Sequence, residues 1–220
     1  MIAASLIERW PEWLSPLLGG LGTSLQLTAA FLVIGLPLGL GFAVMLSAQR
    51  RLVRAVAVAA VELGRAVPVL VLLYLVYFGL PEADIRLSAF VSATIAISFS
   101  FAAYTSEVFK AGIAAVGSGQ REASQALGLT HPQEMRLVVL PQAVRIVIPP
   151  ILGWVVIFFQ ATSLAFAIAV PELLNEAYTI GSSTFRFLSV LLLAALLYAA
   201  VSIPASLAID HLDRRRGPLT

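Results

Sequence analysis

The chain has 220 residues, of which 60% are hydrophobic and only 12% are charged. Soluble globular proteins average about 45 to 50% apolar and about 25% charged residues, so this composition excludes that class and indicates an integral membrane protein. The net charge is only +2, and the lack of cysteine together with a count of two histidines excludes disulfides and thiol nucleophiles and argues against a metal site.

Residues 1–20 are the first element in chain order, and we expect them to form an uncleaved segment at the membrane interface. Trp10 and Trp13 suit that position, because amphipathic rings settle at the level of the lipid headgroups. Charged residues between positions 8 and 12 interrupt the apolar run that a signal peptide requires.

Five apolar stretches follow, and each is long enough to cross a bilayer as a helix. They cover residues 25–46, 55–80, 88–109, 144–170 and 187–209. A helix start is expected at Thr23 and Ser24, and the glycines of the first stretch are expected to permit close helix packing. We therefore predict an all-α membrane protein with five transmembrane helices in a single transmembrane domain, residues 1–220.

A polar loop over residues 110–143 separates the third and fourth stretches, and its pattern predicts two short helices. Residues 121–127 are mostly strong helix formers, Gly128 stands where a helix would end, and Pro132 suits the first turn of a second helix. The side chains that such a hairpin presents are Glu122, Ala123, Gln125, Ala126 and Leu127. We expect it to insert into a groove on another protein.

The arginines and lysines are distributed unevenly between the two sides of the predicted membrane domain. Loops 49–54, 110–145 and 210–220 share one side, which holds ten basic residues, whereas the other side holds three. Because cytoplasmic loops carry the excess of Lys and Arg, we predict the N-terminus outside and both the polar loop and the C-terminus in the cytoplasm.

Glu62 and Arg65 are the most unusual ionisable pair in the predicted spans. They lie three residues apart, so on a helix they share one face, and a helix break near Pro68 would free backbone groups beside them. A zwitterionic solute needs a carboxylate for its ammonium group and a donor for its carboxylate, so both residues are candidate substrate ligands. Two alternatives stay open: the side chains pair with each other, or Arg65 extends to the cytoplasmic interface.

Gln160, Thr162 and Ser163 in the fourth span form a second candidate wall for the solute. The alternative for the two hydroxyl groups is a hydrogen bond to their own backbone, which is common in membrane helices. Glu107 lies three residues before Lys110 and is expected to form an ion pair on the cytoplasmic side instead of contacting solute.

The polar loop resembles the coupling loop of ABC importer permeases, whose pattern is Glu-Ala-Ala, three residues, Gly, nine residues, Ile, any residue, Leu-Pro. At the same spacing this chain has Glu122-Ala123-Ser124, Gly128, Val138 and Leu140-Pro141. The resemblance implies that the residues coupling this chain to an ATPase are Glu122, Ala123, Ser124, Ala126, Leu127 and Gly128.

Further segments resemble the polar amino-acid subgroup of these permeases, so the resemblance covers most of the chain. Residues 61–81 are similar to its second-span motif, and residues 103–116 are similar to the run that leads into the coupling loop. Residues 161–174 are similar to the fourth-span signature of the histidine, arginine and opine branch. Gln160-Ala161 replaces the Lys-Asp or Lys-Glu of many relatives, which removes a carboxylate that in some of them helps hold a cationic solute.

The resemblance implies a type I ABC importer permease, a multi-pass inner-membrane subunit that imports a polar amino acid or a derived solute. It implies a cytoplasmic ATPase dimer that binds ATP and Mg²⁺, a second identical or closely related permease subunit, and an extracytoplasmic solute-binding protein. This chain has no phosphate-binding loop of the type Gly-x-x-x-x-Gly-Lys-Ser/Thr, so we expect no cofactor and no enzymatic activity in this chain. We also expect no nucleic-acid partner. The alternatives are import of an opine or another amine-bearing solute, a passive channel, and a membrane-assembly subunit.

Overall fold

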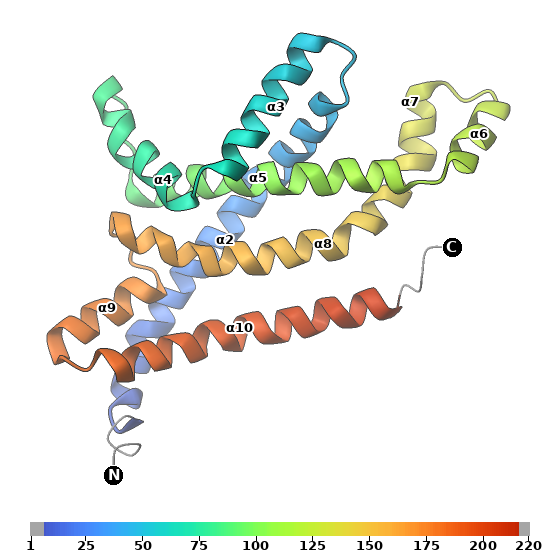
Figure 1. The fold of residues 1–220 in the computed structure, drawn as a ribbon. Helices are drawn as coiled ribbons and strands as arrows, with labels where there is room; N and C mark the ends of the chain where they lie inside the picture. Colours follow the sequence, from blue (N-terminus) through green and yellow to red (C-terminus); the bar gives the residue numbers. More distant parts are fainter. Residues whose placement is uncertain (1–6, 216–220) are drawn as a thin grey trace.

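The computed structural model describes residues 7–215, which form helices and contain no strand (Figure 1). The α-helices are α2 (Trp10–Leu46), α3 (Arg51–Ala66), α4 (Val69–Tyr74), α5 (Ala89–Ala115), α6 (Ser118–Ala126), α7 (His131–Glu134), α8 (Leu140–Ala161), α9 (Leu173–Thr184) and α10 (Phe187–Arg215). Two π-helical segments, η1 and η3, cover Leu75–Gly79 and Met135–Val139, and two 3-10 segments, η2 and η4, cover Leu80–Ala83 and Thr162–Ile168.

Four helical runs are long and apolar enough to cross a membrane, and a bent pair supplies a fifth. The four runs are Trp10–Leu46, Ala89–Ala115, His131–Ile168 and Phe187–Arg214. The bent pair joins Arg51–Ala66 to Val69–Ala83 at an angle of 106°. The structure therefore confirms the prediction of an all-α protein with five spans.

α5 lies at the centre of the bundle, where α2, α3 and α8 pack against it (Figure 1). Phe31, Phe101 and Phe158 meet at this centre with ring centroids 5.1 to 6.1 Å apart. The expected close packing is confirmed at Gly39, because a Cβ there would lie 3.0 Å from the Ala102 carbonyl oxygen.

The segment expected at the membrane interface is not separate from the first span in the residues that the structure describes. α2 begins at Trp10 and runs without interruption past the helix start expected at Thr23. Trp13 is 5% exposed and packs with Leu17 against residues of α9 and α10, so it has a protein partner and not a lipid headgroup. Residues 1–6 of the predicted segment lie outside the described part.

Other helices also extend beyond the expected apolar stretches, because a helix continues into water as long as its backbone hydrogen bonds do. α5 reaches Ala115, and the run through α7, η3 and α8 begins at His131 instead of near residue 144. Residues 171–186, which connect the fourth and fifth expected stretches, contain α9, and α10 passes through Pro204 to Arg215.

The second span is broken at the predicted position. α3 ends at Ala66, and Val67 and Pro68 both have extended backbones, since a proline disfavours helical geometry in the residue before it. Ser100 Oγ donates to the Gly64 carbonyl across 2.9 Å, which satisfies one of the acceptors at this helix end.

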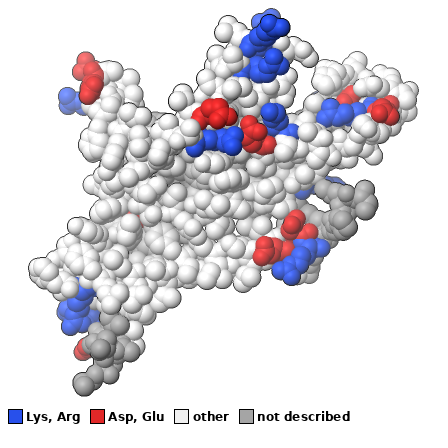
Figure 2. Space-filling model, in the orientation of Figure 1, with Lys and Arg blue, Asp and Glu red and all other residues white. Residues whose placement is uncertain are grey.

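The α6–α7 hairpin projects from one end of the bundle, and the start of α2 lies at the opposite end (Figure 1). The end of α10 lies on the same side as the hairpin. This arrangement agrees with an outside N-terminus and a cytoplasmic hairpin. Figure 2 shows charged side chains at the projecting ends of the molecule and in a patch in the upper middle of this face, at the base of α3, while the surface below that patch is mostly uncharged.

Candidate functional site

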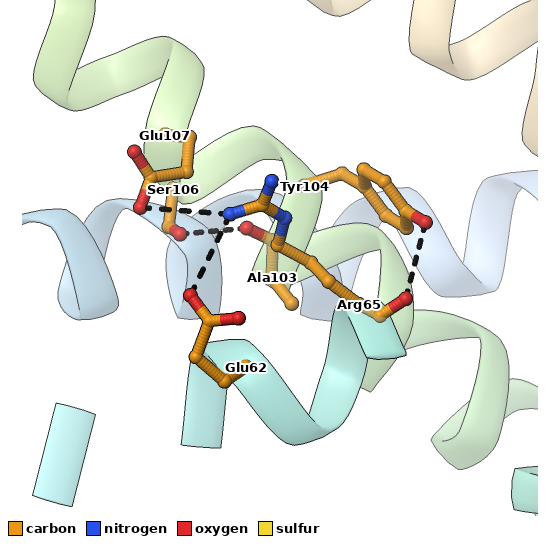
Figure 3. A network of polar contacts seen from close by, with 6 residues as sticks. All are labelled: Glu62, Arg65, Ala103, Tyr104, Ser106 and Glu107. Carbon is orange, nitrogen blue, oxygen red and sulfur yellow. Dashed lines mark hydrogen bonds and ion pairs between the residues drawn. The ribbon is translucent and has the colours of Figure 1, made fainter. Parts of the chain in front are cut away.

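The last turn of α3 holds an ion-pair cluster that faces α5 (Figure 3). One nitrogen of the Arg65 guanidinium lies 3.9 Å from Glu62 Oε1 and 4.0 Å from Glu107 Oε1. Their side chains are about half exposed, at 40%, 65% and 41% for Arg65, Glu62 and Glu107. Two carboxylates around a single guanidinium leave an excess negative charge, which favours an amine ligand.

One of the two alternatives for Glu62 and Arg65 is that their side chains pair with each other, and the structure shows this ion pair. The prediction for Glu107 needs a correction, because the ion pair that the structure shows for it is with Arg65 of α3 and not with Lys110. Sequence spacing suggested the near neighbour, whereas the crossing of α3 over α5 brings the distant guanidinium within reach.

Tyr104 is a member of this cluster that sequence analysis missed. Its hydroxyl donates to the Arg65 carbonyl across 3.3 Å, and the Arg65 guanidinium carbon lies 6.0 Å from its ring centroid. Trp154 of α8 stacks on Tyr104 with centroids 4.4 Å apart, so the cluster is backed by an aromatic wall. A tyrosine within an apolar span carries no sequence signal for this role, because its partner is a backbone carbonyl.

The second candidate wall lies where α8 ends and η4 begins. Thr162 is fully buried and its hydroxyl donates to the Phe159 carbonyl across 2.7 Å, while the Ser163 hydroxyl donates to the Gln160 carbonyl across 2.8 Å. The alternative of backbone bonding is therefore correct for both hydroxyl groups. Gln160 is exposed, so its amide is free to reach a ligand.

The segment that holds part of the second candidate wall packs against the helix that follows the ion-pair cluster in the chain. η4 packs against α4 and α5, so the 3-10 turn after α8 lies beside the helix that starts at the Pro68 break. Interrupted helices expose backbone donors and acceptors, and transporters commonly bind solutes where two such interruptions meet. The arrangement is chemically suited to a small solute with both an amine and a carboxylate.

The α6–α7 hairpin has the geometry that its sequence predicts. α6 ends at Ala126, Gly128 has a φ of +74°, and the Gly128 amide donates to the Gln125 carbonyl across 2.9 Å. Thr130 and Gln133 form a capping box that starts α7. Only a glycine adopts this left-handed turn without strain, so the bend between the two helices is sharply defined.

Most of the residues that are predicted to couple this chain to an ATPase lie on the outer face of this hairpin. Glu122, Ala123, Ala126 and Gly128 are exposed, and Leu127 is 80% exposed. Ser124 points the other way: it is buried and its hydroxyl donates to the Arg121 carbonyl across 2.7 Å. The exposed face offers small side chains, an apolar leucine and a carboxylate to a partner.

At the other end of the bundle, Glu172 is a fully buried carboxylate that sequence analysis also missed. It accepts hydrogen bonds from the backbone amides of Leu174 and Asn175 and from the Tyr198 hydroxyl, at 2.7 to 2.9 Å. Burial raises the pKa of the Glu172 carboxyl above its usual range, although these donors oppose the effect. The residue caps α9 and ties it to α10.

Among residues 7–215 no group of three or more His, Cys, Asp or Glu side chains is arranged to hold a metal ion. A cavity of about 240 Å³ between α2, α4 and α5 is lined by apolar side chains, with Ser98 the exception. With a single hydroxyl among its lining residues, it does not suit a solute that carries both an amine and a carboxylate.

Comparison with known proteins gives a consistent picture. The family described as "Binding-protein-dependent transport system inner membrane component" matches residues 35–218. The chain is 35% identical over 196 residues to the probable amino-acid ABC transporter permease protein YckA of Bacillus subtilis (strain 168), covering 89% of this chain and 87% of that protein.

A second relative is the glutamate/aspartate import permease protein GltK of Escherichia coli O6:H1, which is 37% identical over 210 residues, 90% of this chain and 92% of GltK. The fold is also similar to a crystal structure described as an amino acid ABC transporter with histidines. The TM-score is 0.90 at 29% identity, and the match covers 95% of this chain and 98% of the other.

Proposed function

Because this chain belongs to the family of binding-protein-dependent transport system inner membrane components, we propose that it is the permease subunit through which an ATP-driven importer moves a polar amino acid, or a solute derived from one, into the cytoplasm. It is a multi-pass protein of the inner membrane. The observation that carries the proposal is the meeting of two interrupted helices, the Pro68 break and η4, near an ion-pair cluster.

The nature of the solute follows from the charges at this place. Glu62 is the ligand for the solute amine, and Arg65 is the ligand for its carboxylate. The pairing of these two side chains is weak, because both are substantially exposed, so a solute replaces it at little cost. Gln160 and Ser163 complete the second wall, and the buried Thr162 shapes it from behind.

Amino acids with acidic, neutral or basic side chains all carry the α-amine and the α-carboxylate that Glu62 and Arg65 would bind. The name of GltK supports an amino acid with a polar side chain. An opine or another amine-bearing solute is the alternative, and the two carboxylates near Arg65 support it.

The energy for import comes from separate subunits. A cytoplasmic ATPase dimer binds ATP and Mg²⁺ and grips the hairpin at Glu122 to Gly128, and this chain carries no cofactor and no hydrolytic activity of its own. A second permease subunit, identical or closely related, completes the pathway, and an extracytoplasmic binding protein delivers the solute. Closure of the ATPase dimer displaces the hairpin, and the attached spans tilt so that the solute pathway between the two permease subunits opens outward.

Reconstitution with the ATPase and the binding protein tests this function. We expect the binding protein loaded with glutamate, glutamine or an opine to stimulate ATP hydrolysis, and we expect accumulation of that solute inside proteoliposomes only when ATP is present. A passive channel would instead give solute flux without ATP. A membrane-assembly subunit would give neither flux nor stimulation.

A further inference from the structure

α5 and α6 are separated by a two-residue joint whose backbone is extended. Val116 has φ and ψ of −68° and 118°, and Gly117 has −54° and 142°. The hydrogen-bond ladder that makes a helix stiff stops at such a joint, and the last carbonyl groups of α5 lose their helical partners there. A displacement of α6 would therefore be absorbed by the joint unless another contact bridges it.

Arg121 of α6 makes that bridge. One terminal nitrogen of its guanidinium donates to the Ile113 carbonyl in the last turn of α5 across 2.9 Å. The other terminal nitrogen lies 4.0 Å from Glu134 Oε1 at the end of α7. A single planar group thus spans three helices, and its positive charge also suits the negative end of α5.

Glu134 makes this bridge specific, because its side chain is only 4% exposed. A carboxylate buried to that degree is costly without a cationic partner, so the hairpin is held in the geometry that keeps Arg121 close. Apolar side chains, among them Val116, Val139 and Ala143, form most of the rest of the hairpin base. Gln142 of α8 also donates to Gln120 of α6, but across 3.5 Å and without reaching α5, so this contact does not replace the Arg121 bridge.

The other arm of the hairpin needs no such bridge. α7, η3 and α8 form one helical run from His131, so a displacement of α7 reaches the fourth span through continuous backbone hydrogen bonds. The extended joint that could absorb a displacement of the hairpin therefore lies only between α5 and α6.

We propose that Arg121 and Glu134 are positioning residues that form a strut, defined here as the Ile113–Arg121–Glu134 contacts, through which α5 follows the hairpin during transport. The strut rests on the proposed function, because it matters only if an ATPase moves the hairpin. Neither side chain belongs to the exposed face that meets the ATPase, since Arg121 is 31% exposed and Glu134 only 4%.

The test compares Arg121→Gln, Glu134→Gln and the double variant in the complete transporter, reconstituted with its ATPase and binding protein. We expect each single variant to bind the ATPase normally but to hydrolyse about three to ten times more ATP per solute imported. The double variant should be no worse than Arg121→Gln, because that substitution already removes both contacts of the strut and Glu134→Gln then removes the buried carboxylate that is left without its partner. Arg121→Lys keeps the charge but not the planar fork, and should be intermediate.

Arg54→Gln is the matched control, because it removes an exposed cytoplasmic arginine that lies on α3 and not on the hairpin. Hydrogen exchange of the amides over residues 113–128 gives a readout that does not depend on transport, and it should accelerate in the three neutral variants but not in Arg54→Gln. Unchanged ATP consumption and unchanged exchange in Arg121→Gln would overturn the strut.

The failure of the proposed function is distinguishable from the failure of the strut. If the wild-type complex imports no polar amino acid, the function is wrong, and the strut's role in coupling falls with it. If the wild type imports solute and the single variants do so at the same cost in ATP, only the strut is wrong. Strictly additive effects in the double variant also contradict it.

Discussion

Two buried carboxylates show how single residues hold this membrane protein together. The Glu134 carboxyl group lies 4.0 Å from the Arg121 guanidinium, whereas Glu172 accepts hydrogen bonds from neutral donors, the Leu174 amide of α9 and the Tyr198 hydroxyl of α10. Desolvation by burial raises the pKa of Glu172 more than these donors lower it, so we expect the stability that Glu172 contributes to depend on pH.

Glu172→Gln should destabilise the protein by about 1 to 3 kcal/mol, because both oxygens of the Glu172 carboxyl group can accept a hydrogen bond even when it is protonated, whereas the amide nitrogen of glutamine cannot. Because the folded pKa of Glu172 is raised above its ordinary value of 4.5, the folded protein binds a proton more tightly than the unfolded chain. The stabilisation is therefore complete below pH 4.5 and is lost as the pH rises through the folded pKa.

Thermal unfolding in detergent measures both effects. The wild type should melt above Glu172→Gln, and the gap should narrow as the pH is raised from 4.5. Comparing the two proteins at each pH cancels the contributions of the other carboxylates. A gap that widens with pH would contradict the assignment.

The exposed ion pair of Glu62 with Arg65 predicts a different kind of sensitivity. Glu62→Gln removes the proposed partner of the solute amine, and a lost charge-assisted hydrogen bond should lower solute-stimulated ATP hydrolysis about tenfold or more. Folding should be unaffected, since the pair is exposed. Glu82→Gln, an exposed carboxylate in η2, is the control. Equal activity of both variants would show that Glu62 does not touch solute.

At the scale of elements, the helices approach one another where a glycine faces a neighbouring backbone. A Cβ at Gly20 of α2 would lie 2.9 Å from Leu173 Cα and 3.0 Å from the Glu172 carbonyl carbon. The start of α9 is therefore seated directly on α2. Ser24 strengthens this seat, because its hydroxyl accepts from the Leu173 amide across 3.3 Å.

Gly20→Val should separate α2 from α9 and destabilise the protein by about 1 to 3 kcal/mol, because backbone atoms cannot move aside as a flexible side chain can. Gly22→Val in the same helix is the matched control, since nothing lies within 4 Å of a Cβ at that position. Melting temperatures of the purified variants distinguish the two. Equal decreases in melting temperature for the two variants would mean that the effect of valine on the helix itself, and not packing against α9, explains the loss.

At the scale of the whole molecule, the fold separates a packed bundle from a projecting hairpin, which we propose as the docking site of the ATPase. The central core of α2, α4, α5 and α8 is apolar and closely packed, whereas the outer face of α6 is exposed over Glu122, Ala123 and Leu127. A displacement applied to the hairpin acts at one end of long helices, so small movements there become larger movements at the far end.

Glu122→Lys should leave membrane insertion and folding intact, because the residue is exposed. It should uncouple ATP hydrolysis from uptake, because it reverses a charge on the hairpin face that we propose binds the ATPase. Asp213→Lys makes the same change of charge at the exposed end of α10, away from the hairpin, and should transport normally. Uptake assays in proteoliposomes give the comparison. Wild-type uptake by Glu122→Lys would contradict docking at this face.

Much of this architecture was predictable because membranes impose a simple rule. An apolar stretch of sufficient length must be a helix, so the five spans, their sidedness and the break at Pro68 followed from composition, charge and one proline. The turn at Gly128 was equally local, since it depends on the conformational freedom of a single residue. The coupling and solute-contact roles of the individual residues stay predictions.

The extents and partners of these helices were decided by tertiary packing. Trp13 is a core residue because α9 and α10 meet it, Glu107 pairs with Arg65 because α3 crosses α5, and Arg121 reaches Ile113 because the chain bends at Gly117. The sequence by itself determined which segments cross the membrane, since that depends on local hydrophobicity. Only the tertiary structure decided which distant charges meet, because contacts between helices depend on how they cross and not on spacing along the chain.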